Sequence, residues 1–146
     1  MPIKTFRGLI AHNAIDTISL HTNDGSMGYR IVKFQVIPQA PTSATSEGVV
    51  QIFKVPQTAA SDVVDFSDQT LLGMAFYNQD STPSNNVSQV IIFDQDIVNQ
   101  DIYITCVDHP LNSPFMNYYI ELEQVKLDLS ENTVATLKDM RNIASQ

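Results

Sequence analysis

The chain has 146 residues, 43% of them hydrophobic, and its 16 acidic and 8 basic residues give a formal net charge of −8. This length and composition suit one compact domain with a hydrophobic core, predicted to span residues 1–146. The low glycine count and moderate charge argue against a disordered protein, and the negative net charge argues against nucleic acid or anionic lipid as partners.

The first half of the chain alternates short apolar strands with polar segments. A period of two residues predicts strands over 3–10, 16–21, 29–37 and 49–55. In the third of these, Val32, Phe34 and Val36 should face one side together. Pro38 lacks a backbone donor and is expected to end that strand, whereas Gly8 should mark a bend or bulge in the first.

The second half continues the pattern, with strands predicted over 71–77, 87–93 and 101–107. The short polar stretch 94–100 predicts a hairpin-like connection between the last two of these strands. Turn-forming and polar residues predict irregular or exposed segments at 22–26, 39–48, 57–68, 78–86 and 109–116.

The stretch from 117 to 143 combines a long strand with a short helix. One side of the strand carries Tyr118, Ile120 and Leu122. Farther on, the apolar set moves to Val125, Leu127 and Leu129. Because a slip of one residue exchanges the two faces of a strand, a bulge is expected near Glu123–Gln124. On the predicted helix, apolar residues recur every three positions at Val134, Leu137, Met140 and Ile143.

Together these features predict an all-β fold: an antiparallel β-sandwich of seven or eight strands, jelly-roll-like, with a short C-terminal helix or arm. Residues 1–15 and 130–146 are candidate assembly arms of this single domain. The four helix residues Val134, Leu137, Met140 and Ile143 are the candidate partner-binding residues. A short isolated helix is marginal, so it must dock on its own sandwich or on a neighbouring subunit.

Residues that could support catalysis are few and poorly grouped. Cys106, the only cysteine, lies in an apolar run and is interpreted as a small buried hydrophobe. The three histidines are far apart in sequence, which disfavours a zinc site. Glu121 and Glu123 share a strand face at a spacing of roughly 6.6–7 Å, but outer-face residues explain them better.

Two possible ligand sites can also be explained structurally. Tyr118 and Tyr119 could stack on a sugar together with Tyr103, but paired tyrosines usually pack across a sheet. The segment Asp94–Asp101 carries oxygen ligands suited to calcium, yet Val98 occupies a ligand position and no glycine makes the sharp turn. We therefore assign no catalytic, cofactor-binding or metal-binding residue and expect that the chain is not an enzyme.

Targeting signals are not apparent. No run approaches the roughly 18 apolar residues of a membrane span. The first residues, Met1 to Lys4, lack the apolar core of a signal peptide. We therefore expect the chain to be made in, and assembled from, a cytoplasm, with neither nucleic acid nor membrane as a partner.

Several segments, in order along most of the chain, form a recognisable pattern: Asp16–Gly25, Gly28–Phe34, Val64–Leu71, Val90–Asp94 with Asn99–Tyr103, and Tyr118–Lys138. Together they resemble small virion structural proteins of marine tailed bacteriophages. The resemblance implies a virion part. It does not distinguish capsid from tail, and it transfers no catalytic residue.

Three classes of function follow from these observations. The leading hypothesis is a structural virion protein, a capsid decoration or cement protein that binds the major capsid protein and copies of itself as a homo-oligomer on the virion. The alternative is a tail or fibre module that recognises a host glycan, with Tyr77, Asn78 and residues 85–86 facing the ligand. An enzyme is the third class, and it is disfavoured because no acid–base or metal-ligand spacing is apparent.

Removal of residues 130–146 tests the role of the C-terminal arm. If the arm connects subunits, the truncated domain should melt near the full-length temperature, because its sandwich core is intact, yet it should fail to join particles. Thermal unfolding and co-sedimentation with particles measure the two effects. An unfolded or grossly destabilised truncation would instead place the helix in the core of its own domain.

Overall fold

The computed structural model describes residues 2–20, 26–39, 46–79, 87–93, 96–109 and 115–127. These residues form eight strands: β1 (Ile3–Ala11), β2 (Ile15–Ile18), β3 (Met27–Pro38), β4 (Ser46–Phe53), β5 (Leu71–Gln79), β6 (Val87–Ile92), β7 (Ile102–His109) and β8 (Phe115–Lys126). The described part of the chain contains no helix, and hence none that is long and apolar enough to span a membrane.

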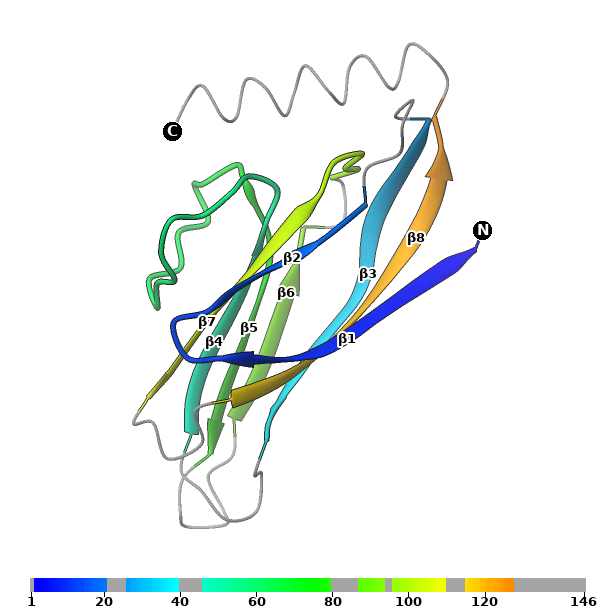
Figure 1. The fold of residues 1–146 in the computed structure, drawn as a ribbon. Coiled ribbons are helices and arrows are strands. Elements are labelled where there is room, and N and C mark those ends of the chain that lie inside the picture. Colours follow the sequence, from blue (N-terminus) through cyan, green and yellow to red (C-terminus); the bar gives the residue numbers. More distant parts are fainter. Residues whose placement is uncertain are drawn as a thin grey trace.

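Two antiparallel sheets pack face to face as a β-sandwich, as the short alternating strands predict (Figure 1). Sheet A has three strands in the order β1-β8-β3, and sheet B has five in the order β2-β7-β4-β5-β6. The chain passes from sheet A to sheet B at Asn13, whose φ of 63° forms the corner between β1 and β2. Asparagine tolerates this left-handed conformation better than most residues.

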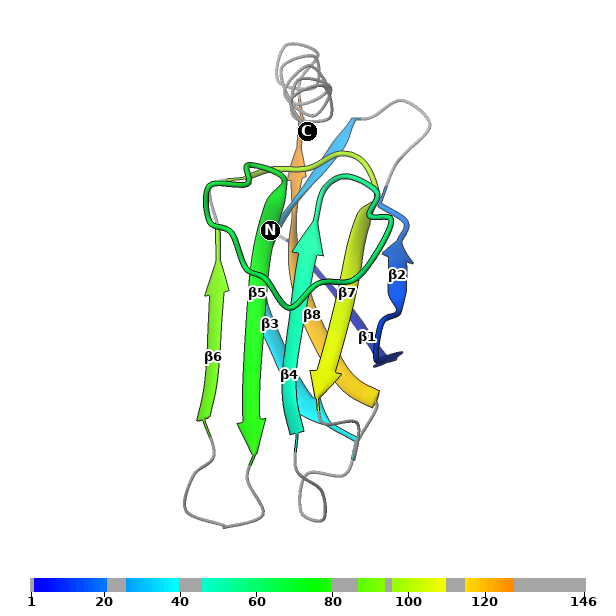
Figure 2. The same cartoon turned by 90° about the vertical axis from the view of Figure 1, so that its left-hand side faces the viewer.

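The strand pairing is that of a jelly roll with one strand displaced. In a jelly roll, a long hairpin rolls up so that first and last strands pair, then second and seventh, third and sixth, and fourth and fifth. Here β1 pairs with β8, β2 with β7 and β4 with β5. The pair β3–β6 is missing, because β6 pairs with β5 at the edge of sheet B (Figure 2). Sheet A therefore has only three strands, with β3 at its edge.

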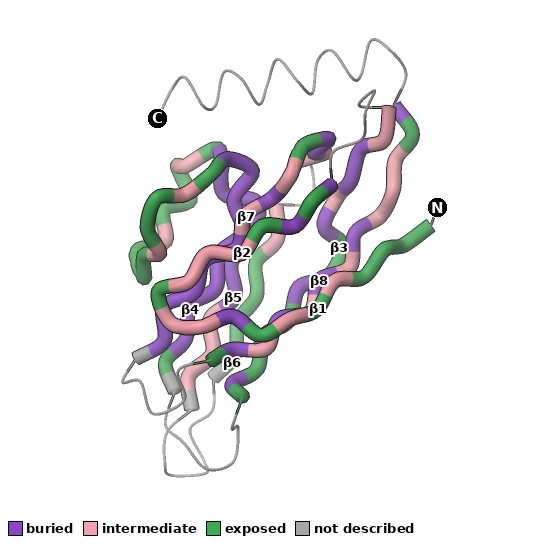
Figure 3. The backbone as a smooth tube through the Cα atoms, in the orientation of Figure 1, coloured by how far each residue is buried: buried purple, intermediate pink, exposed green. Residues whose placement is uncertain are grey.

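The core lies between the two sheets, where buried and exposed residues alternate along the strands (Figure 3). In β8 every second residue is buried from Met116 to Leu122. Sheet B contributes a second buried layer that includes Val50, Ile52, Ala75, Ile102, Ile104 and Cys106. The alternation in the sequence predicts this layering, and the inward side of Tyr118, Ile120 and Leu122 is confirmed.

The predicted bulge occurs on β3 and not on β8. β8 pairs with β3 without a slip through residues 123–124, and its pairing with β1 is unbroken as far as Glu123. The register shifts instead between Ile31 and Lys33, which makes Val32 the extra residue. A bulge changes the faces of the strand that carries it and not those of its partner, so the apolar shift at Val125 in β8 does not arise from this bulge.

This bulge also corrects the predicted faces of β3. Val32 is 40% exposed, whereas Ile31, Phe34 and Val36 are buried in the core. The prediction that Val32 lies on the same side as Phe34 and Val36 is therefore wrong, and the shared side of Phe34 and Val36 is confirmed. The extra residue keeps both halves of the strand directed at the core.

The connection between β6 and β7 is not a hairpin. These strands are separated in sheet B by β5 and β4, so the chain crosses the end of the sandwich to reach β7. On the way, Val98 forms a two-hydrogen-bond bridge with Tyr29 of β3, with N–O distances of 2.7 and 2.9 Å. A hairpin prediction assumes that successive strands are neighbours, and β6 violates this assumption.

Gly8 marks a close contact and not a bulge, because β1 pairs with β8 in unbroken register. A Cβ atom at Gly8 would lie 2.7 Å from the hydroxyl oxygen of Tyr118. The ring of Tyr118 therefore lies across the glycine, and its hydroxyl is 3.4 Å from Oδ2 of Asp16. Burial and the nearby Asp16 carboxylate raise the pKa of Tyr118.

Strand boundaries differ modestly from expectation. β3 ends at Pro38 as predicted, while β4 begins at Ser46 and β5 extends to Gln79, so the two flanking loops are shorter than predicted. Residues 57–68 form no strand, as expected. The predicted turn at 22–26, except for Ser26, and the predicted helix with Val134, Leu137, Met140 and Ile143 lie outside the described residues.

Replacement of Cys106 by alanine tests its role in the core. The thiol is fully buried, so at neutral pH the substitution should lower the free energy of unfolding by about 1 kcal/mol or somewhat more. Burial, followed by the Asp108 and Asp16 charges, raises the pKa of Cys106 from its ordinary 9.0 to about 12. Between these two pKa values the thiol is protonated in the folded state and ionised in the unfolded state. The unfolded state therefore binds fewer protons than the folded state, and the free energy of unfolding of the wild type falls as the pH rises.

The alanine variant lacks this titration, so the stability difference between the two proteins should shrink from pH 9 to pH 11. Denaturant unfolding of both proteins at several pH values measures this difference. Tyrosine side chains also ionise at high pH, but they do so in both proteins, so their effect cancels in the comparison. Rapid alkylation of Cys106 in the native protein at neutral pH would contradict the buried assignment.

Candidate functional site

The two outer faces of the sandwich differ in how they are covered. The outer face of sheet B lies under the connection of residues 54–70, called here the acidic loop, which passes in front of β4, β5 and β7 in Figure 2. Gln51 and Thr105, paired on that face, are each 1% exposed. The outer face of sheet A, called here the open face, leaves Arg7, Lys33 and Gln35 exposed.

Side chains on the open face form rows, because β1 and β3 both pair with β8. The central row is Arg7, Tyr119 and Gln35. On one side of it lies the row of Thr5, Glu121 and Lys33, and on the other lies the row of Leu9, Asn117 and Ile37. Leu9 and Ile37 are 43% and 45% exposed, which gives this end of the open face an apolar character.

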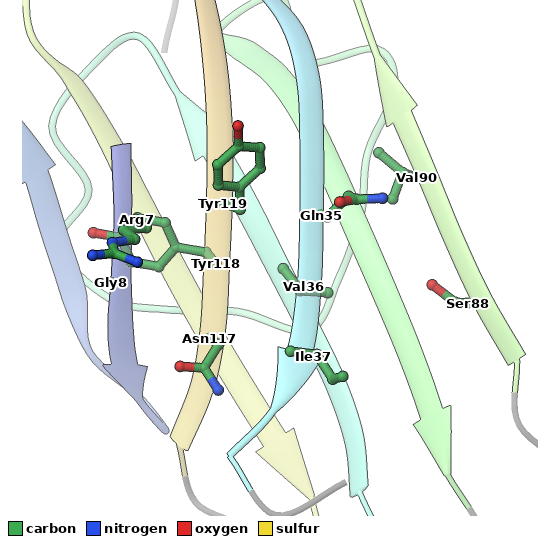
Figure 4. A pocket seen from close by; sticks show the side chains of 10 residues that line it. All are labelled: Arg7, Gly8, Gln35, Val36, Ile37, Ser88, Val90, Asn117, Tyr118 and Tyr119. Carbon is green, nitrogen blue, oxygen red and sulfur yellow. The ribbon is translucent and has the colours of Figure 1, made fainter. Parts of the chain in front are cut away.

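A shallow groove of about 770 Å³ crosses the open face. It runs over β1, β8 and β3 and reaches β6 beyond the edge of sheet A (Figure 4). Arg7, Tyr119, Gln35 and Asn117 line it from the sheet, and Ser88 and Val90 line it from β6. The groove reaches β6 because no fourth strand of sheet A covers the space beside β3.

The carboxylates of the open face are engaged by neighbours. Glu123 forms an ion pair with Arg30 at 3.1 Å, and the Tyr119 hydroxyl donates a hydrogen bond of 2.7 Å to Glu121. This hydrogen bond raises the pKa of Tyr119. The ammonium of Lys33 lies 5.9 Å from the centroid of the Tyr119 ring, which is within the range of a cation–π contact. The two glutamates are thus outer-face residues with separate partners, as expected.

The three tyrosines considered for sugar stacking do not form a platform. Tyr118 faces the core, Tyr119 faces outward on sheet A, and Tyr103 lies on the outer side of β7 in sheet B. Tyr77 packs partly buried against the core, and Asn78 belongs to the same strand, β5. Residues 85–86 lie outside the described part of the chain.

Charges are segregated between the two sheets. Of the six basic residues described, five lie on the strands of sheet A: Lys4, Arg7, Arg30, Lys33 and Lys126. With Glu121 and Glu123 as the two acidic residues of these strands, sheet A carries a net charge of +3. The remaining described residues carry eight acidic side chains against Lys54 alone. Lys4 and Lys126 pair with Leu122 and Met27 on the inward side of sheet A. The open face itself therefore carries Arg7, Arg30 and Lys33 against Glu121 and Glu123, a net charge of +1 on an acidic protein.

The acidic loop is fixed to sheet B by specific hydrogen bonds. The side-chain amide of Gln51 donates to the carbonyl oxygens of Ser61 and Val63, at 2.9 and 3.2 Å. Asp65 accepts bonds from both the backbone and the hydroxyl of Ser67, at 2.9 and 2.6 Å. These bonds lower the pKa of Asp65, so its carboxylate stays charged to more acidic pH than usual.

Two large apolar side chains project from the acidic loop. Val63 is 71% exposed and Phe66 is 54% exposed. The ring of Phe66 is held edge-on against Phe93, with centroids 5.4 Å apart. Asp62 and Asp65, both exposed, flank these residues in sequence. The loop thus presents apolar side chains beside negative charge.

The other residues considered for chemistry have structural partners. The Nδ1 atom of His12 accepts a hydrogen bond of 3.0 Å from the backbone of Asp108. In the segment considered for calcium, Asp96 lies 3.8 Å from Lys54, and Asp101 accepts a bond of 3.0 Å from the backbone of Leu20. Within the described ranges, no group of three or more histidine, cysteine or acidic side chains is arranged to hold a metal ion.

Sequence reasoning identified neither the open face nor the acidic loop as a site. The available signal was that Arg7, Arg30 and Lys33 fall on predicted strands, whereas Asp62, Asp65 and Asp68 fall in a predicted irregular segment. These residues can be placed on separate surfaces only when β1, β3 and β8 are known to share one sheet.

Replacement of Gln51 by alanine tests the anchoring of the acidic loop. Loss of two buried hydrogen bonds should lower the free energy of unfolding by about 1–3 kcal/mol and speed amide exchange near residues 61–63. Gln69→Ala, at an exposed position of the same loop, is the matched control and should change stability by less than about 0.5 kcal/mol. Equal effects of the two substitutions would contradict the anchoring role.

Comparison of the chain with protein-family models and with curated proteins found no match. The open face and the acidic loop are therefore the features from which a function can be inferred.

Proposed function

We propose that this chain is a structural virion protein of a tailed phage, a capsid decoration or cement protein that binds the major capsid protein and copies of itself. The observation that carries the proposal is the open face: a partly apolar sheet surface with a net charge of +1 on an otherwise acidic sandwich. Its composition suits docking to another protein better than exposure to solvent alone.

The open face has the composition of an interface. Leu9, Ile37 and Phe115 are large apolar side chains that are 38–45% exposed at one end of sheet A. Arg7 and Lys33 lie on neighbouring rows. An apolar patch with polar and charged surroundings is typical of protein–protein contacts. Basic charge would also steer the chain toward an acidic partner surface.

Two further considerations support a virion role. The displaced jelly-roll pairing belongs to an architecture that recurs in viral capsid domains, although this is an analogy of fold and not of site. The sequence pattern described above resembles small virion proteins of marine tailed phages. Both considerations agree with the open face in pointing to assembly.

A tail or fibre module that recognises a host glycan is the second candidate. The groove favours it, because Tyr119 offers an aromatic surface and Gln35 and Asn117 offer amide groups for sugar hydroxyls. Location and copy number in the particle distinguish this role from decoration of the capsid.

Quantitative immunoblotting of gradient-purified particles of the encoding phage tests the proposed function. A decoration protein should sediment with the major capsid protein and be present on the order of hundreds of copies per particle, because capsid sites repeat by symmetry. A few to a few dozen copies would favour the tail module. Absence from purified particles would overturn both virion roles.

A further inference from the structure

We propose that copies of this chain associate head to tail, with the acidic loop of one copy docked on the open face of the next. The inference rests on the assembly role proposed above for its biological setting. It goes further by naming a second copy of the chain as the occupant of the open face and residues 57–68 as the segment that docks.

Charge complementarity selects the second copy as the occupant. The open face carries a net charge of +1, with Arg7 and Lys33 exposed on it. The acidic loop carries Asp62, Asp65 and Asp68, and its single basic residue, Lys54, is only 5% exposed. Opposite charges on two surfaces of one molecule attract one copy to the next and disfavour contacts between like surfaces.

The apolar groups of the two surfaces are also complementary. Val63 and Phe66 project from the acidic loop and are more than half exposed. The open face offers the groove of about 770 Å³ and the exposed side chains of Leu9 and Ile37. An aromatic side chain inserted into a groove is a frequent anchor of protein interfaces, and flanking charged pairs set its orientation.

The geometry of the fold favours a head-to-tail contact. The acidic loop lies over the outer face of sheet B, on the opposite side of the sandwich from the open face (Figures 1 and 2). The acidic loop of one copy therefore cannot contact the open face of the same copy. Each copy that is added exposes a further open face. Such heterologous contacts produce closed rings or open filaments, according to the rotation between copies.

The acidic loop is already ordered before it docks. Gln51 holds its middle to sheet B, Asp68 accepts bonds from the backbone and hydroxyl of Thr70, and Phe93 supports Phe66. Binding by a preorganised segment avoids much of the entropy loss that a disordered segment would incur. The exposed apolar tip of this loop is thus presented in a fixed position.

Charge-reversal variants of the full chain test the inference by sedimentation velocity. Arg7→Glu with Lys33→Glu disables the open face, and Asp62→Lys with Asp65→Lys disables the loop. All four positions are exposed, so both variants should retain the wild-type melting temperature within a few degrees. The first variant makes the net charge more negative than −8 and the second makes it less negative, so a general charge effect cannot weaken both.

The expected result is concentration-dependent association of the wild type that weakens with added salt, and association weaker by on the order of a hundredfold or more in each variant. An equimolar mixture of the two variants should associate again, because the intact loop of one variant fits the intact open face of the other and the reversed loop fits the reversed open face. The chain with all four reversals should associate again.

Three results would overturn the inference: a wild type that stays monomeric at millimolar concentration, variants that associate as strongly as the wild type, or a mixture that does not associate. None of these results alters the particle experiment, which tests the virion role independently. Conversely, if the protein were absent from particles, a contact between copies measured by sedimentation would still be valid.

Discussion

Pairing of β8 with β1 on one side and with β3 on the other is the interaction on which the rest of the structure depends. It directs alternate residues of β8, from Met116 to Leu122, into the core. Full burial of one such large apolar side chain is worth about 1.5–3 kcal/mol. The same pairing aligns the outward residues into rows, so the interaction that stabilises the sandwich also arranges the open face.

The groove of the open face extends beyond sheet A because β6 belongs to sheet B. With β6 beside β5, sheet A lacks a fourth strand and the groove extends past β3 to Ser88 and Val90. Sheet B, in contrast, has its outer face covered by the chain's own loop, which Gln51 fixes in place. The outer face of sheet B is thus covered within the molecule, whereas the outer face of sheet A retains exposed apolar and basic side chains.

Local patterns in the sequence predict the parts of this fold that depend on local geometry. The alternation of Tyr118, Ile120 and Leu122 identifies their inward side, and Pro38 marks the end of β3. The apolar shift at Val125 predicts the bulge on the wrong strand, because the extra residue is Val32 of β3. In β3 two apolar residues, Ile31 and Val32, are adjacent, and periodicity does not say which of them lies in the core.

The connection 94–100 and the open face depend on which strands become neighbours, and hydrophobic periodicity carries no information about strand order. Charges that look scattered along the sequence therefore separate in space. Arg7 and Lys33 are distant in the chain, yet they lie on adjacent rows of one sheet because β1 and β3 both flank β8.

The displacement of β6 has a further consequence for β3. As an edge strand, β3 exposes backbone groups on the side away from β8, where the described residues provide a bridge only through Tyr29 and Val98. Unprotected edges recruit strands from other molecules and lead to aggregation. The bulge at Val32 interrupts this edge, the charge of Lys33 lies next to it, and Pro38 removes a donor at its end. The irregularity that keeps Phe34 in the core thus also makes the exposed edge a poor template for amyloid-like growth.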